Sequence, residues 1–122
     1  MENEGEIRLA RELYAKCAID FWVVLNERGH KPANRISNKA RSLLESWGER
    51  GKAVDLLYPL LSHEQEAVRL AAATGLLDYG APAQAIAVLR DISKNPEGFM
   101  AVTARILLRK HGISSLEDGS VH

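Results

Sequence analysis

The sequence predicts an all-α fold, built as a short α-solenoid of three helix-turn-helix units. Apolar residues recur at helical spacing along most of the chain, which favours amphipathic helices over strands. Three glycines that follow such segments are evenly spaced, since 80 − 48 = 32 and 112 − 80 = 32. The same offset aligns small or apolar residues of successive segments, such as Ala40, Ala72 and Ala104, and Leu44, Leu76 and Leu108. These alignments indicate a repeat period of about 32 residues.

The first unit is expected to contain the longest helix of the chain, over residues 7–28. Gly29 is expected to end this helix, and residues 30–32 to form the turn that follows. A second helix is expected over residues 34–47, and Gly48 is expected to stop it, because glycine adopts the left-handed conformation at low cost.

The central unit is predicted to have helices over residues 52–61 and 64–78, with Gly80 ending the second. Gly75 lies inside the second of these helices, where glycine is less favourable than alanine by about 1 kcal/mol. The repeat offset aligns Gly75 with leucines in the two neighbouring units. The sequence therefore predicts that another helix passes close to Gly75.

In the third unit, Ala81 and Pro82 are expected to open a fifth helix, since proline is tolerated in the first turn of a helix. A sixth helix is expected over residues 99–111, ending at Gly112. Residues 1–112 are thus expected to form a single helical-repeat domain, and residues 113–122 a polar C-terminal tail.

Composition argues against several classes of protein. The 122 residues carry 16 basic and 16 acidic side chains, so no net charge draws the chain towards nucleic acid or anionic lipid. No apolar run approaches the roughly 20 residues that span a bilayer. Residues 1–6 form an acidic and polar stretch, which does not resemble a secretory signal. A single cysteine allows no internal disulfide, so the sequence predicts a cytoplasmic protein.

Two stretches of the central unit resemble a known family. The Pro-Leu-Leu of residues 59–61 and the Glu-Ala-Val-Arg-Leu-Ala-Ala of residues 66–72 resemble a HEAT repeat. In layout, residues 34–112 are similar to a small bacterial HEAT-like family, the domain of unknown function number two-thousand-nineteen. Ser62 and His63 stand where HEAT repeats usually have an aspartate, so Arg69 is expected to lack that partner. The resemblance implies a helical-repeat fold and protein binding, and it implies no reaction.

Residues suited to catalysis or metal binding are few and scattered. No histidine among His30, His63, His111 and His122 has a second ligand three or four residues away on a helix. Cys17 falls on the apolar stripe of the first helix, which favours a core residue over a nucleophile. The chain has neither a correctly spaced phosphate-binding loop nor a Gly-x-Ser-x-Gly stretch. We therefore expect no enzymatic activity, no metal and no cofactor.

The candidate binding surface is the face of each second helix that points away from its own first helix. At about 100° per residue, the positions opposite Ala72 are Leu70, Thr74 and Leu77. The repeat offset adds Asn38, Ser42 and Glu45 in the first unit, and Val102, Ile106 and Arg109 in the third. Such a stripe lines the concave side of a stack, and its apolar part favours an interaction site. Trp22 is a second candidate anchor for a partner.

Alternatives to an exposed stripe stay open at this stage. The chain itself could cover the stripe, through supertwist, the N-terminal half of the first helix or the tail around Leu116. Two copies of the chain could also associate through it. For Trp22, packing beneath Arg28 or Asn26 is equally compatible with the sequence.

The sequence favours a non-catalytic module that binds another protein through its inner face. The resemblance to bacterial HEAT-like proteins implies that inhibiting a toxic enzyme, as an immunity protein, is one form of this function. Nucleic-acid binding or base repair is an alternative, with phosphate contacts from Arg35, Lys39, Arg41, Arg105, Arg109 and Lys110. Zero net charge and few aromatic residues argue against that alternative. A structural homodimer joined through the apolar patch is the third hypothesis.

Overall fold

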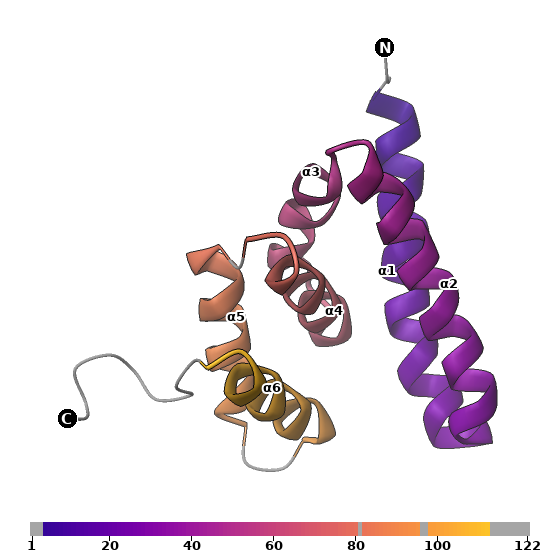
Figure 1. Cartoon of the computed structure of the whole chain (residues 1–122). Helices are drawn as coiled ribbons and strands as arrows, with labels where there is room; N and C mark the ends of the chain where they lie inside the picture. The colour runs from indigo at the N-terminus through magenta and orange to yellow at the C-terminus, as the bar shows by residue number, and fades with distance from the viewer. Residues whose placement is uncertain (1–3, 81, 96–97, 113–122) are drawn as a thin grey trace.

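The computed structural model describes residues 4–80, 82–95 and 98–112 (Figure 1). The all-α fold class is confirmed, and the described residues contain no strand. In chain order the helices are α1 (Glu4–Arg28), α2 (His30–Glu49), α3 (Ala53–Leu57), the 3₁₀ helix η1 (Tyr58–Ser62), α4 (Glu66–Leu77), α5 (Ala83–Ser93) and α6 (Phe99–Lys110). The predicted tail, residues 113–122, lies outside the described residues, so the boundary at residue 112 stays a prediction.

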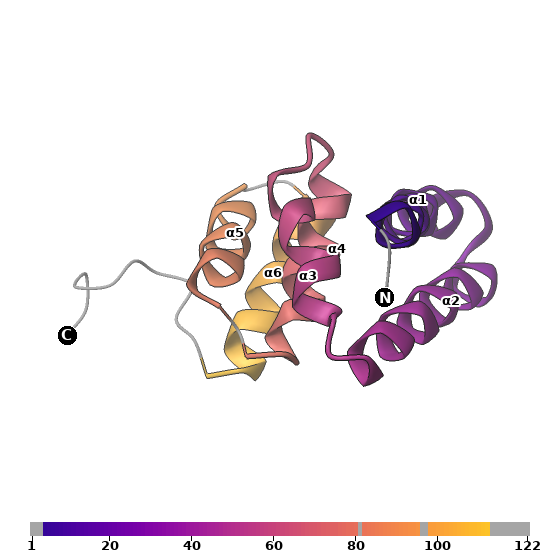
Figure 2. The same cartoon turned by 90° about the horizontal axis from the view of Figure 1, so that it is seen from above.

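The helices lie as neighbouring pairs in chain order (Figure 2). Helix α1 packs on α2, α3 and η1 pack on α4, and α5 packs on α6. The third pair meets the central pair through both of its helices, because α5 and α6 each contact α4. The first pair meets α4 mainly through α1 rather than α2. Residues of α2 that the 32-residue offset aligns with residues of α4 therefore have different neighbouring helices.

The connection between α1 and α2 is shorter than expected. A single residue, Gly29, separates the two helices. The turn predicted over residues 30–32 is wrong, because these residues form the first turn of α2. Pro32 is tolerated there because the amides of a first turn have no acceptor within their own helix.

Gly48 does not end α2, although the even glycine spacing predicted that it would. The helix continues to Glu49, and the left-handed position falls on Gly51, at φ +73°. Across this turn the amide of Lys52 donates to the carbonyl of Trp47 at 2.9 Å. This is the bond by which a glycine-terminated helix satisfies one of its last carbonyls.

The small size of Gly48 has a different explanation. A Cβ atom built on Gly48 would lie 2.4 Å from Tyr79 Oη, so glycine lets the segment after α4 approach α2. Gly80 and Gly112 do adopt positive φ angles, +109° and +73°, where the sequence predicted helix ends. Two of the three evenly spaced glycines thus follow helix ends, and the third allows a close contact.

The helix predicted over residues 52–61 is divided at Pro59, where α3 gives way to η1. Proline has no amide hydrogen, so it cannot donate to the carbonyl of Asp55, four residues back, or of Leu56, three residues back. Arg11 of α1 supplies both bonds: its Nε donates to Leu56 O and its Nη2 to Asp55 O, each at 2.9 Å. The break in the central pair is therefore a point at which α1 is attached.

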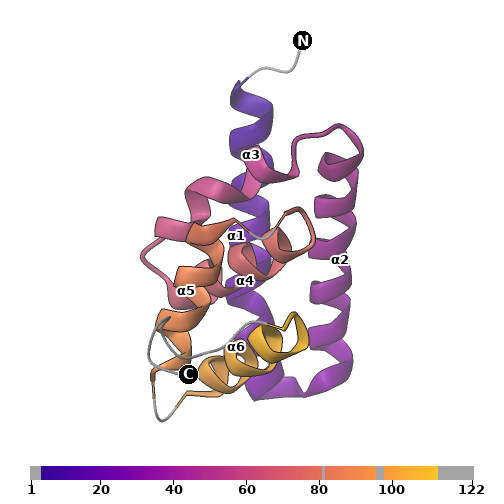
Figure 3. The same cartoon turned by 60° about the vertical axis from the view of Figure 1, so that its left-hand side comes forward.

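Helix α4 is the centre of the fold, and Figure 3 shows α4 and α6 between α5 and α2. Its residues without exposed surface are Val68, Ala72, Ala73 and Leu76. The predicted close approach at Gly75 is confirmed, because a Cβ atom built there would lie 2.7 Å from Leu57 Cδ1 and 3.0 Å from Leu44 Cδ2.

Arg69 does have partners, although the aspartate usual in HEAT repeats is missing. Its Nη1 donates to the carbonyls of residues 63–64, at 2.7 and 3.1 Å. Arg105 of α6 makes similar bonds to the carbonyls of Ser93 and Asn95, at 3.1 and 3.2 Å. Each arginine thus attaches the second helix of its pair to the segment that leaves the first.

Candidate functional site

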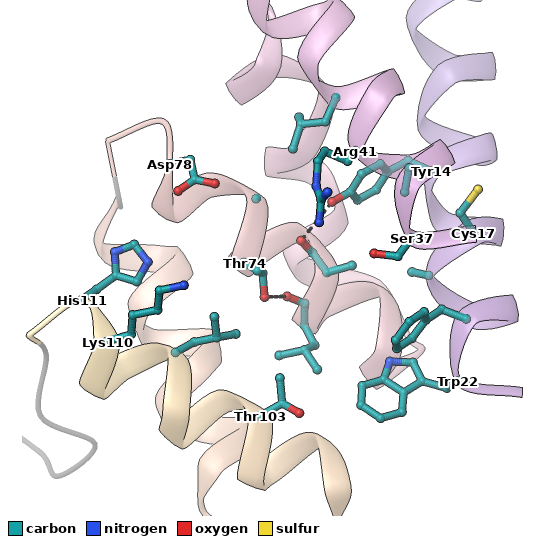
Figure 4. Close-up of a pocket in the computed structure, with 18 residues that line it drawn as sticks. Tyr14, Cys17, Trp22, Ser37, Arg41, Thr74, Asp78, Thr103, Lys110 and His111 are labelled. Carbon is teal, nitrogen blue, oxygen red and sulfur yellow. Dashed lines mark hydrogen bonds between the residues drawn. The ribbon is translucent and has the colours of Figure 1, made fainter. Parts of the chain in front are cut away.

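A groove lies between the hairpin of α1 and α2 on one side and α6 on the other, with α4 as its floor (Figure 4). We call it the α4 groove. It is open to solvent and encloses about 510 Å³, within the range of roughly 300–1,000 Å³ that is usual for ligand sites. Side chains from all four helices line it, so its shape depends on the packing of the whole fold.

The α1 side of the α4 groove is aromatic, and aliphatic residues of the floor and of the opposite wall also line it. Phe21 and Trp22 of α1 lie there with their ring centroids 5.3 Å apart and the rings perpendicular. Leu70 of α4 and Leu107 of α6 add aliphatic surface. Trp22 is only half-buried, so part of its indole is available to a ligand. Large aromatic side chains of this kind are typical anchors in protein interfaces.

Charged side chains border the rest of the groove. Lys110 and His111 stand at the end of α6, Asp78 follows α4, and Arg41 reaches over from α2 (Figure 4). Arg41 Nη1 donates to Asn38 Oδ1 at 3.4 Å, and no ion pair of Arg41, Asp78 or Lys110 occurs in the described part of the chain. The groove therefore combines two basic side chains, Arg41 and Lys110, with one carboxylate.

Burial raises the pKa of two ionisable groups of the groove wall, Tyr14 and Cys17. Burial raises the pKa of Tyr14 to about 12, with smaller contributions from Cys17 and Tyr79. The Tyr14 hydroxyl donates to the carbonyl of Ala71 at 3.2 Å and so connects α1 to α4. Burial also raises the pKa of the Cys17 thiol, which disfavours the thiolate needed for nucleophilic chemistry. The prediction that Cys17 is a buried core residue is confirmed.

The shift at Tyr14 predicts a loss of stability in alkali. Tyr14 ionises near its ordinary pKa of 10.0 in the unfolded chain, but stays neutral to about pH 12 in the folded chain. Its contribution to the free energy of unfolding is therefore complete below pH 10 and is lost as the pH rises through 12. Because each pKa unit corresponds to about 1.4 kcal/mol, we expect a loss of about 2 kcal/mol by about pH 11.5.

Urea unfolding at about pH 9 and about pH 11.5 measures this loss. The control is Tyr14→Phe, which lacks the ionisable hydroxyl and should lose about 2 kcal/mol less between the two pH values. An equal loss in the wild type and in Tyr14→Phe would assign the alkaline sensitivity to other groups.

The inner face predicted on α4 is mostly buried. Leu70 and Leu77 expose only 4% and 6% of their surface, so they do not form an exposed binding stripe, and the alternative that the chain itself covers them holds. The reason is that α4 is the central helix and has α1 on one side and α5 and α6 on the other. Leu70 nevertheless borders the groove, as does Thr74, whose Oγ1 donates to the carbonyl of Leu70 at 2.6 Å.

The residues predicted on α2 and α6 are exposed but do not line the groove. They are Asn38, Ser42, Glu45, Val102, Ile106 and Arg109. Neighbouring positions line it instead: Ser37, Arg41 and Leu44 on α2, and Thr103, Leu107 and Lys110 on α6. The shift is one residue towards the N-terminus on α2 and one towards the C-terminus on α6. Helices on opposite sides of a groove turn towards it in opposite senses, and one residue corresponds to about 100°.

Trp22, the site residue that the sequence predicted on α1, does line the groove. Asp78 and His111 were not among the predicted site residues. The repeat offset carries a signal for this end of the groove, because it aligns Asp78 with Lys110, and both stand at the end of a second helix. A role for any of these residues in binding is untested and is argued below as a proposal.

Within the described residues, no cluster of three or more histidine, cysteine, aspartate or glutamate side chains could hold a metal ion. No helix in this part of the chain is long and apolar enough to cross a membrane. No family model matches the chain, and no curated protein and no solved structure matches it. The resemblance to HEAT-like proteins therefore stays a prediction, and the function is argued from the α4 groove.

Proposed function

We propose that this chain is a non-catalytic module that binds another protein through the α4 groove. The observation that carries the proposal is an open groove of about 510 Å³ that is lined by a half-buried tryptophan and bordered by charged groups. Grooves that bind a helix combine an apolar floor with polar margins, because a bound amphipathic helix buries one face and leaves the other in water. The groove has this composition.

The proposal includes the finer architecture predicted from the sequence, a short solenoid of three HEAT-like units. The order of the helix pairs supports it. A single buried cysteine supports a cytoplasmic location. Inhibition of a toxic enzyme is one form of the function, supported by the sequence resemblance alone.

Site-specific photo-cross-linking tests the proposal. A benzophenone amino acid at Ser37 or at Thr103 places the probe on opposite walls of the groove, and one at the exposed Ala87 of α5 is the control. We expect the same partner to be cross-linked from both groove positions and not from Ala87. Cross-linking from Ala87 alone would contradict the proposal.

With the purified partner, Trp22→Ala is expected to raise the dissociation constant at least about tenfold, as is usual for an aromatic anchor. Circular dichroism of the variant checks that the helices are retained. Unchanged affinity in a folded Trp22→Ala variant would show that the aromatic side of the groove does not contact the partner.

A structural homodimer is a second candidate, favoured by one observation. Val102 and Ile106 of α6 are 47% and 52% exposed and lie one turn apart. A parallel pairing of two α6 helices would also bring the basic residues Arg109 and Lys110 of both copies together, which opposes association at low salt. Light scattering at two protein concentrations and two salt concentrations tests it, and a monomer under all four conditions would exclude it.

A further inference from the structure

The α4 groove has an uneven charge distribution. Arg41 stands on the α2 wall and Lys110 on the α6 wall, and each points to the same open space (Figure 4). The one carboxylate that borders this space is Asp78, which forms no ion pair with either cation among the described residues. The border therefore carries an excess of positive charge before His111 is counted.

This excess is local, because the whole chain has 16 basic and 16 acidic residues. Helix α6 contains Arg105, Arg109 and Lys110 and no acidic residue. Arg105 is held by the carbonyls of Ser93 and Asn95, which leaves Lys110 as the α6 cation that borders the groove. On the aromatic side, Phe21 and Trp22 supply apolar surface without a neighbouring acidic side chain in the groove lining.

We propose that the groove selects an acidic amphipathic segment of the partner protein, and this inference rests on the proposed protein-binding function. Apolar side chains of the segment lie against Trp22 and Leu107, and its carboxylates meet Arg41 and Lys110. Charge-assisted hydrogen bonds in a partly desolvated groove are stronger than ion pairs on an open surface, so the two cations contribute to specificity as well as to association rate. A partner segment without acidic residues would leave both cations desolvated and unpaired.

Two small probes test the inference without knowledge of the partner. 8-Anilinonaphthalene-1-sulfonate joins an aromatic body to an anion, and N-phenyl-1-naphthylamine is nearly the same aromatic body without charge. Fluorescence titration of the full chain at about 0.15 M ionic strength, where exposed charges more than about 8 Å apart are largely screened, measures the affinity for each. We expect the anionic probe to bind more tightly, and Arg41→Gln/Lys110→Gln to weaken it at least about fivefold while changing the neutral probe less than about twofold.

A matched control exists on the same two helices. Lys39→Gln/Arg109→Gln also removes one lysine and one arginine from α2 and α6, but at exposed positions outside the groove. We expect this control to change the binding of both probes less than about twofold, as is usual for screened surface charges. An equal loss in the control would show that general positive charge, not the groove, attracts the anion, and would overturn the inference.

The remaining outcomes separate this inference from the proposed function. If both probes bind, Trp22→Ala weakens both, and Arg41→Gln/Lys110→Gln changes neither, the groove binds ligands but its charge does not select them. If neither probe binds, the groove is closed to ligands and the proposed function fails as well. An oligothymidine of about 12 nucleotides tests the alternative ligand. If it binds tightly and the binding depends on Arg41 and Lys110, the two cations bind nucleic-acid phosphates, and the inference of an acidic protein segment is overturned.

Discussion

Gly75→Leu is expected to lower the free energy of unfolding by about 3 kcal/mol or more. A Cβ atom at this position would lie 2.7 Å from Leu57 Cδ1, 3.0 Å from Leu44 Cδ2 and 3.3 Å from Tyr14 Oη. These side chains come from α3, α2 and α1, and all three are buried. A leucine therefore fits only if three helices move away from α4, and a close-packed core resists such a movement. Denaturant unfolding followed by circular dichroism measures the loss.

Ala87→Leu is the matched control, because Ala87 also lies inside a helix but is exposed. Its effect on the free energy of unfolding is expected to stay within about 0.5 kcal/mol. Gly75→Ala should lie between the two variants, since the gain of about 1 kcal/mol in helix propensity offsets part of the steric conflict. Wild-type stability in Gly75→Leu would mean that α1, α2 and α3 do not converge on α4 at this point.

The packing at Gly75 could be predicted from the sequence because two local facts agreed. Glycine inside a helix is unfavourable, and the repeat offset places leucines at the equivalent positions of the other units. The same kind of local information predicted the all-α class and the approximate helix positions. Local information gave a wrong helix end at Gly48. Glycine occurs both at helix ends and at close contacts between segments, and the sequence does not show that Tyr79 lies over Gly48.

The exposed face could not be predicted in the same way. Helical periodicity relates the residues of one helix to each other, but it does not say how the helix is turned towards its neighbours. Leu70 and Leu77 are buried because α4 has neighbours on both sides, and this depends on contacts between residues far apart in the chain. For the same reason the groove is lined by Arg41 and Lys110 rather than by the predicted Ser42 and Arg109.

Arg11→Met is expected to lower the free energy of unfolding by about 3 kcal/mol, since hydrogen bonds from charged groups contribute about 1.5–3 kcal/mol each. Arg11 donates to the carbonyls of Asp55 and Leu56, neither of which can accept a hydrogen bond from Pro59. Methionine keeps the unbranched apolar part of the side chain and removes the donors. Arg8→Met is the control on the same helix, because Arg8 is exposed, and its effect should stay within about 0.5 kcal/mol.

A double-mutant cycle with Pro59→Ala tests the reason for this effect. Alanine at position 59 supplies the missing amide, so α3 can continue and bind the carbonyl of Asp55 within the helix. The loss caused by Arg11→Met should then fall to about 1 kcal/mol, which corresponds to a coupling of about 2 kcal/mol between two residues of different helices. Strict additivity would show that Arg11 stabilises the fold independently of the proline. Coupling would show that the break in the central helix pair is what attaches α1, and with it the wall of the groove that carries Trp22.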